Sequence, residues 1–398
     1  MAKQYLSIDV LTAAQERIAK VFDDFPKIYV SFSGGKDSGV MLHLVMSEAI
    51  RRNRKVGVLF VDLEAQYKMT IEYVRSQFEK YKDYIDPYWV SLPIHLRNAV
   101  SQFEPQWVCW DADREGDWVR RPDEMSITEA SYFPFFRTAM EFEEFVPAFG
   151  QWYADGKLCA CFVGIRADES LNRFRTVARK KSTFEQLQWT TWCGGHLYNA
   201  YPIYDWRTED IWIYNGKFKA EYNRLYDRMH QAGLTIHQAR ICQPYGDDQR
   251  KGLWLYHIIE PETWGRVVAR VNGANQGALY VQESGNILGY RNISKPAHLT
   301  WRQFAESILA SMPPSTAEHY RNKIAVFLKW YADRGYPRGI PDEGSATNKD
   351  SPSWTRICKA LLRNDYWCKG LSFSQNKTTA FSKYQSLMKK RRSEWGLI

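Results

Sequence analysis

Short apolar runs alternate with helical periodicity through the first half of the chain. The run Lys27–Phe32 is rich in β-branched and aromatic residues, and a helical pattern follows it to about Arg52. A second apolar run, Val56–Leu63, precedes a second helical pattern, Tyr67–Tyr84. Strands that alternate with helices pair in parallel through right-handed crossovers, so this order predicts an α/β fold with a parallel sheet and helices on both faces. Further strands are predicted at Ile85–Leu92, Leu158–Ile165 and Leu197–Ile203.

The pattern becomes mainly helical beyond about residue 215. At 398 residues the chain is longer than one ordinary core usually fills. We therefore expect two domains, residues 1–215 and a mainly helical region at 216–398. A long insertion, at about 96–155, separates the third and fourth predicted strands.

The chain is basic, with 54 Lys and Arg against 45 Asp and Glu and a formal net charge of +9. Basic clusters lie at Arg51–Lys55, Arg179–Lys181 and Lys389–Arg392. This balance suits a polyanionic partner such as a nucleic acid, although solvated helix ends also explain short basic runs. No stretch approaches the roughly 20 apolar residues of a membrane span, and the N-terminus lacks the apolar core of a signal peptide. We expect a cytoplasmic protein without membrane contact.

The seven cysteines are odd in number and scattered, which argues against a disulfide framework and favours reduced thiols. Four of them, Cys159, Cys161, Cys193 and Cys242, are candidate ligands for zinc or an iron–sulfur cluster. Their spacing matches no tight ligand pattern, and the first two alternate along a predicted buried strand, where cysteine acts as a small apolar residue. We therefore expect neither zinc nor an iron–sulfur cluster.

The loop Ser33–Ser38 separates the first strand from the first crossover helix. Gly34 and Gly35 leave the backbone open, so its N–H groups can approach a phosphate, and the following helix start adds free N–H groups and a positive dipole end. Lys36 supplies a positive charge. The alternative is a tight turn that merely needs glycine. Neither the Walker spacing nor the dinucleotide GxGxxG spacing occurs here.

The string SFSGGKDS resembles the PP-loop family of ATP pyrophosphatases and sulfonucleotide reductases. In that family the loop holds the phosphates of an adenine nucleotide, and a bond next to the α-phosphate is broken. The resemblance implies an adenine nucleotide alpha-hydrolase-like fold. It also implies a phosphate-binding set of Ser31, Ser33, Gly34, Gly35, Lys36, Asp37 and Ser38.

Three further segments match motifs of phosphoadenylylsulfate (PAPS) reductases in family order. Asp62, which ends the second strand, resembles the aspartate of a VDTG-like segment that contacts the nucleoside; an aspartate that merely caps a turn is the alternative. The segment YPIYDWRTEDIWIY, residues 201–214, resembles a structural motif of the family, and in it Thr208 is expected to cap a helix. The string VGIRADESLNRFR resembles an anion-gripping motif and implies binding roles for Arg166, Glu169, Ser170 and Arg173.

The resemblance implies that Lys36, Asp37 and Arg166 are catalytic, that ATP or PAPS is the substrate and that Mg²⁺ takes part. This sequence has no ECGxH-like segment, so the resemblance favours ATP cleavage over thiol-dependent PAPS reduction. The C-terminal half is similar to a subgroup with a domain of unknown function, including the immunoglobulin-binding regulator A proteins. That similarity implies an alternative: a non-catalytic, nucleotide-sensing regulator acting with a ParB-like partner.

Overall fold

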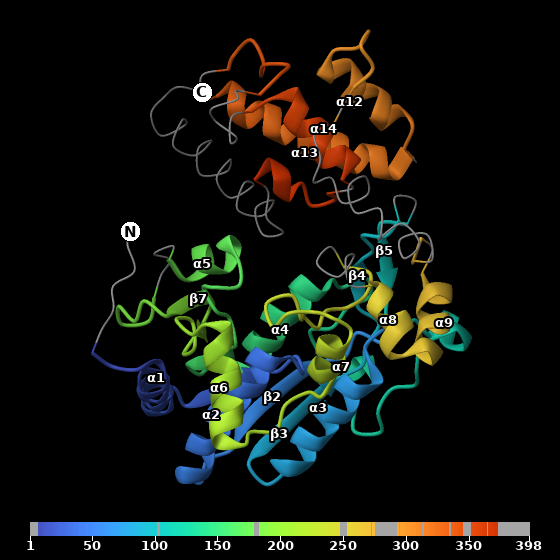
Figure 1. Ribbon diagram of the computed structural model, residues 1–398. Coiled ribbons are helices and arrows are strands. Elements are labelled where there is room, and N and C mark those ends of the chain that lie inside the picture. Colours follow the sequence, from blue (N-terminus) through green and yellow to red (C-terminus); the bar gives the residue numbers. More distant parts are fainter. Residues whose placement is uncertain are drawn as a thin grey trace. The chain divides into compact units, whose positions relative to one another are not determined.

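The computed structural model describes eleven stretches of the chain. They are residues 7–101, 104–178, 183–246, 253–271, 273–274, 293, 295–312, 314–333, 336–344, 352–363 and 365–372. The described residues form two compact units (Figure 1): one drawn from residues 1–96, 108–244 and 252–270, the other from 97–107, 245–251 and 271–398. The domain boundary expected near residue 215 stays a prediction.

A six-stranded sheet organises the first unit. Its strands are β1 (Lys27–Ser31), β2 (Val56–Val61), β3 (Ile85–Val90), β6 (Cys159–Val163), β7 (Thr190–Gly194) and β8 (Leu197–Ala200). Their order is β3-β2-β1-β6-β8-β7, and every neighbouring pair is parallel except β7 with β8. The predicted α/β class with a mainly parallel sheet is confirmed. The antiparallel strand β7 was not predicted.

Helices cover both faces of this sheet (Figure 1). Ile28 and Val30 of β1 face one way, into a core shared with α1 (Val10–Asp24), α2 (Lys36–Arg51), α3 (Lys68–Lys80) and α6 (Thr208–Phe218). Tyr29 faces the other way, against α4 (Phe142–Ala154), where its ring lies 5.3 Å from Phe149 and 5.4 Å from Tyr153. The period-2 alternation of β1 thus buries both faces, as expected for a central parallel strand.

The 201–214 motif joins α1 to α6. Trp206 is buried and donates from Nε1 to the Val10 carbonyl at 3.0 Å, and Asp205 forms an ion pair with Arg17 at 2.7 Å. The motif therefore supports the fold, as expected. The predicted cap is wrong by one residue: α6 begins at Thr208, and residue 207 occupies the N-cap position.

The remaining elements of the first unit are short. They are η1 (Ala112–Asp117), η2 (Ala130–Tyr132), α5 (Leu171–Ala178), α7 (Leu225–Gln231), α8 (Leu253–Ile259) and α9 (Pro261–Arg270). Strands β4 (His95–Arg97) and β5 (Gln106–Val108) form a separate two-stranded sheet. The buried carboxylate of Glu64 accepts from the backbone N–H groups of Trp110 (2.8 Å) and Val119 (3.1 Å) and pairs with Arg270 (2.7 Å). Glu64 thereby ties the insertion and α9 to the end of β2.

The described residues of the C-terminal region are mainly helical, as predicted, and those beyond residue 271 belong to the second unit. Its helices are α12 (Trp301–Ala310), α13 (Pro314–Ala332), α14 (Trp354–Leu362) and the short η4 (Lys369–Leu371). Ala305, Tyr320 and Ile357 lie at the centre of its own apolar core. Thr300 and Ser353 cap α12 and α14 with their side chains. Across both units, none of the helices in the described residues is long and apolar enough to cross a membrane.

Candidate functional site

The glycine loop lies where β1 ends and α2 begins, at the carboxyl edge of the sheet. The chain segments that carry Asp62 and Arg166 follow β2 and β6, the two strands that flank β1. Parallel strands bring their carboxyl ends to one edge, so three predicted motifs meet there. Gly34 has φ +71°, and a Cβ built on it would stand 2.9 Å from Thr70 Cγ2. Only glycine fits this turn without strain.

The N-cap residue of α2 makes no side-chain cap hydrogen bond, whereas Asp9 caps α1 with its carboxylate. Gly35 occupies the N-cap position, and the Lys36 N–H donates to the Tyr226 hydroxyl at 3.0 Å. An uncapped helix start carries partial positive charge on its first N–H groups. The end of α2 that faces the loop therefore favours an anion.

Hydroxyl groups gather around Gly35. The oxygens of Ser33 and Ser38 lie 2.9 Å apart. A Cβ built on Gly35 would stand 3.4 Å from Ser33 Oγ, 3.5 Å from Tyr226 Oη and 3.9 Å from Ser38 Oγ. The absent side chain thus leaves a small cradle lined by three hydroxyls, where a phosphate oxygen would find donors. One of them, Ser38 Oγ, donates to the Gly35 carbonyl at 3.1 Å in this structure.

A network of ion-paired side chains with alternating charge lies beside the loop. Arg166 donates from Nε to Asp37 Oδ1 at 2.5 Å, and Lys36 Nζ lies 3.3 Å from Asp37 Oδ2. Glu169 lies 3.9 Å from Arg166 and also pairs with Arg173. Three cations against two carboxylates leave one positive charge in excess.

One nitrogen of the Arg166 guanidinium makes no hydrogen bond within the described part of the chain. The Arg166 side chain is 1% exposed, and this nitrogen is its Nη1. A buried guanidinium N–H without a partner is costly, and a phosphate or sulfate oxygen would satisfy it. With the cradle at Gly35, this fits the loop to the phosphate end of a nucleotide.

The other predicted residues lie beside the loop and make contacts within the protein. Ser31 ends β1, and Ser170 Oγ accepts the Arg173 N–H at 3.2 Å, at the start of α5. Lys36 is buried, and its Nζ contacts the Ala239 carbonyl at 3.4 Å and lies 5.4 Å from the Tyr226 ring. These contacts hold the ammonium group close to the loop.

Asp62 is fully buried, and its carboxylate is already engaged. It accepts from Trp89 Nε1 at 2.9 Å and from the Glu64 N–H at 3.1 Å, and it pairs with Arg120. The structure thus places Asp62 at the predicted edge with its oxygens occupied by protein donors. Its contact with a nucleoside stays a prediction.

Three residues of the site were not identified from the sequence. Asn223 donates from Nδ2 to the Gly34 carbonyl at 3.0 Å and to Thr70 Oγ1 at 2.9 Å, so it fixes the turn from outside the motif. Tyr226 contacts Lys36 as described above. A Cβ on Gly164 would stand 3.1 Å from the Ser38 nitrogen, so β6 and α2 approach closely there. Of the three, only Gly164 lies within a motif visible in the sequence, as the glycine of the GIR string.

No group of three or more His, Cys, Asp or Glu is placed to hold a metal ion within the described ranges. All seven cysteines lie in those ranges; five are buried, and Cys193 and Cys242 are partly exposed. Burial raises the pKa of Cys159 and Cys368 to about 12, and that of Cys161 further. These buried thiols are poor nucleophiles at neutral pH.

The arginines of the Arg51–Lys55 cluster are engaged within the protein. Arg51 and Arg52 pair with Glu48 at 2.5 Å, and Arg54 donates to backbone carbonyls. The other two basic clusters, 179–181 and 389–392, lie outside the described residues. The charge argument for a nucleic acid therefore gains no support from this cluster.

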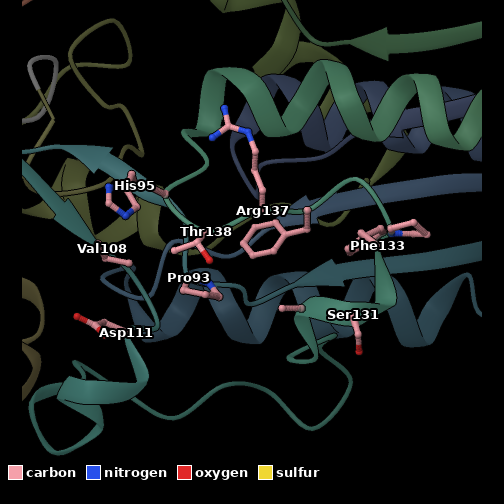
Figure 2. Close-up of a pocket in the computed structure, with 12 residues that line it drawn as sticks. Pro93, His95, Val108, Asp111, Ser131, Phe133, Arg137 and Thr138 are labelled. Carbon is pink, nitrogen blue, oxygen red and sulfur yellow. The ribbon is translucent and has the colours of Figure 1, made fainter.

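A separate cavity of about 720 Å³ lies in the insertion (Figure 2). Its described lining includes His95, Asp111, Phe133 and Thr138, and none of the predicted nucleotide-binding residues is among them. Figure 2 shows the Arg137 side chain extending away from Pro93 and Thr138; its guanidinium pairs with Glu144 at 2.6 Å. This cavity is distinct from the loop.

Comparison with known proteins agrees with the motifs. The family model of the phosphoadenosine phosphosulfate reductase domain matches residues 27–110 and 120–246, more than half of the chain. The chain belongs to the PAPS reductase family. This is a family of enzymes that binds adenine nucleotides. A second family model, a domain of unknown function (DUF3440), matches residues 233–344.

Similar proteins match different fractions of the chain. The uncharacterized protein YbdN of Escherichia coli K12 is 46% identical over 397 residues, which cover 99% of this chain and 97% of YbdN. An adenosine 5′-phosphosulfate reductase of Shouchella clausii is 21% identical, over 62% of this chain and 83% of the reductase. The crystal structure of a PAPS reductase from Candida auris, a phosphate complex, covers 57% of this chain and 94% of its own, at 15% identity and a TM-score of 0.33.

Proposed function

We propose that this member of the PAPS reductase family binds an adenine nucleotide at the loop Ser33–Ser38 and breaks a bond next to its α-phosphate. The observation that carries the proposal is the buried Nη1 of Arg166, which lacks a hydrogen-bond partner within the described ranges, beside the start of α2, where the N-cap Gly35 makes no side-chain cap. Both features favour an anion, and family membership makes the nucleotide's phosphate end the natural candidate.

ATP is the substrate that the site supports best. An oxygen of an acceptor or of water attacks the α-phosphorus, the bond to the β-phosphate oxygen breaks, and pyrophosphate leaves with the bonding electron pair. Lys36 and Arg166 stabilise the negative charge that develops on the leaving group. Asp37, the carboxylate of the loop, would help to hold Mg²⁺ together with the nucleotide's phosphates, and the ion would neutralise part of their charge.

Reduction of PAPS is the less favoured reaction, because it needs a reactive thiolate. Five of the seven cysteines are buried, and burial raises the pKa of several of them far above neutrality. The similarity to the immunoglobulin-binding regulator A proteins, a ParB-like partner, a nucleic-acid acceptor and a cytoplasmic location also remain predictions. They rest on resemblance and charge.

Incubation of the purified protein with labelled ATP and, separately, with labelled PAPS and a thiol reductant such as thioredoxin tests the proposal. Formation of AMP and pyrophosphate, lost in a Lys36→Ala variant, supports ATP cleavage. Formation of adenosine bisphosphate and sulfite would instead assign PAPS reduction. Binding of either nucleotide without turnover would favour the regulatory alternative, and binding of neither would overturn the proposal.

A further inference from the structure

Tyr226 points its hydroxyl at the glycine loop from a distant part of the chain. It lies in α7, 190 residues after Lys36, and is 4% exposed. Its oxygen accepts the Lys36 N–H at 3.0 Å, and its ring lies 5.4 Å from Lys36 Nζ. These two contacts fix the phenol against the first turn of α2.

The hydroxyl is one of three that converge on the same point. Around the position that a Cβ of Gly35 would occupy, Tyr226 Oη lies at 3.5 Å, Ser33 Oγ at 3.4 Å and Ser38 Oγ at 3.9 Å. The two serines belong to the loop itself and are expected there. Tyr226 is brought in by the tertiary fold.

The Tyr226 hydroxyl still has a proton to donate. A phenol donates one hydrogen bond and can accept others. Its oxygen accepts from Lys36, and in the part of the chain that the structure describes its O–H has no recorded acceptor. Burial raises the pKa of Tyr226, and the charge of Asp37 adds to this rise, so the hydroxyl stays protonated at neutral pH. A buried O–H that lacks an acceptor among the described residues and lies at the positive end of a helix is suited to an anionic oxygen.

We propose that Tyr226 is a ligand-binding residue whose hydroxyl donates a hydrogen bond to a phosphate oxygen of the bound nucleotide. This inference rests on the proposed function and deepens it, since it adds a donor from outside the loop. The rival role is structural: Tyr226 pins the Lys36 amide and never touches the ligand.

A matched pair of variants separates these roles. Tyr226→Phe removes only the hydroxyl and keeps the ring, which lies 5.5 Å from that of Trp212. Tyr222 is the control, because its ring also packs on Trp212, at 5.3 Å, while its hydroxyl bonds to Asp227 and Arg224. Binding of ATP, PAPS and adenosine is measured by calorimetry for wild type, Y226F and Y222F, and the melting temperature is measured without ligand.

We expect the Kd of Y226F for the phosphate-bearing nucleotide to rise roughly 10- to 100-fold, as for loss of one hydrogen bond to a charged group. Adenosine binding should stay close to wild type, and Y222F should match wild type in its binding of all three ligands. The melting temperature of Y226F without ligand should fall in either role, because the Lys36 N–H loses its acceptor. Equal binding of ATP or PAPS by Y226F and wild type would overturn the inference and leave the proposed function standing. A similar weakening of adenosine and nucleotide binding in Y226F would show the structural role and overturn the inference. Absence of ATP and PAPS binding by wild type would overturn both.

A second variant covers the case in which Y226F does not fold. Gly35→Ala would place a methyl group among the three hydroxyls without a severe clash, since its nearest contact would be 3.4 Å. If a phosphate oxygen lies in this cradle, G35A should lose ATP and PAPS binding and keep its melting temperature. Wild-type affinity in G35A would contradict the inference.

Discussion

The two adjacent glycines of the loop should respond to alanine in opposite ways. Gly34 has φ +71°, whereas Gly35 has φ −81°, which any residue adopts. Replacement of Gly34 should therefore damage the fold. Replacement of Gly35 should damage ligand binding alone.

The expected loss for Gly34→Ala has two sources. The left-handed conformation costs a non-glycine residue roughly 1–2 kcal/mol. The new Cβ would stand 2.9 Å from Thr70 Cγ2 and 3.1 Å from Val74 Cγ2, and overpacking of this kind costs roughly 1–3 kcal/mol. The sum is about 2–5 kcal/mol, which corresponds to a fall in melting temperature of roughly 4–20 °C for a unit of this size.

For Gly35→Ala the terms nearly cancel. Alanine is a poorer N-cap than glycine by roughly 0.5–1 kcal/mol. It also restricts the unfolded chain, which stabilises the fold by about 0.4–1 kcal/mol. The net change in the free energy of unfolding should lie within about 0.5 kcal/mol of zero, while the methyl group occupies the cradle between Ser33 and Tyr226.

Thermal unfolding followed by circular dichroism, without nucleotide, measures the first effect, and ATP titration of each folded variant measures the second. The reasoning predicts a destabilised G34A and a stable G35A that binds ATP weakly. A G34A variant as stable as wild type would refute the strained turn. A G35A variant with wild-type affinity would refute the cradle.

Arg166→Lys keeps the positive charge but removes the planar fork and its Nη1, so we expect the Kd for ATP to rise roughly 10-fold or more; calorimetry showing an unchanged Kd would contradict the role of this arginine. Burial lowers the pKa of His43, and the charge of Lys80 adds to this, below the usual 6.5. The folded state then binds fewer protons than the unfolded chain, so stability should be full above about pH 6.5 and fall below it. Urea midpoints measured between pH 5 and 7.5 should show a shallower acid decline in His43→Gln, and identical declines would count against this. Cys242→Ser should release AMP and pyrophosphate at the wild-type rate, since ATP cleavage needs no thiol. A rate more than about tenfold lower, with an intact fold, would instead indicate that the Cys242 thiol takes part in the reaction.

Local sequence was sufficient to predict the loop and its flanking elements. The β-branched run of β1, the helical spacing of α2 and the glycines between them act within about 25 consecutive residues. The parallel order then placed Arg166 and Asp62 at the same edge, because each follows a strand that neighbours β1. Confirmation of the mainly parallel sheet therefore also confirms that these motifs meet.

Contacts between distant segments could not be predicted. Asn223 and Tyr226 reach the loop across about 190 residues, and no spacing rule signals that approach. Asp62 was correctly predicted at the end of β2, but its burial depends on Trp89 and on Arg120. Arg120 belongs to the insertion, whose sequence shows no helical or strand periodicity from which its position could be predicted. Strand β7 was missed because it is a short antiparallel edge strand, five residues long, outside the βαβ repeat.

The central claim is that the main-chain amides and hydroxyls of Ser33–Ser38 hold the phosphates of an adenine nucleotide. A crystal structure of the protein soaked with ATP or PAPS tests it most directly. The account predicts phosphate density within hydrogen-bonding distance of the first turn of α2, of Arg166 Nη1 and of Tyr226 Oη. Density for the nucleotide elsewhere, with that turn free of ligand, would contradict it.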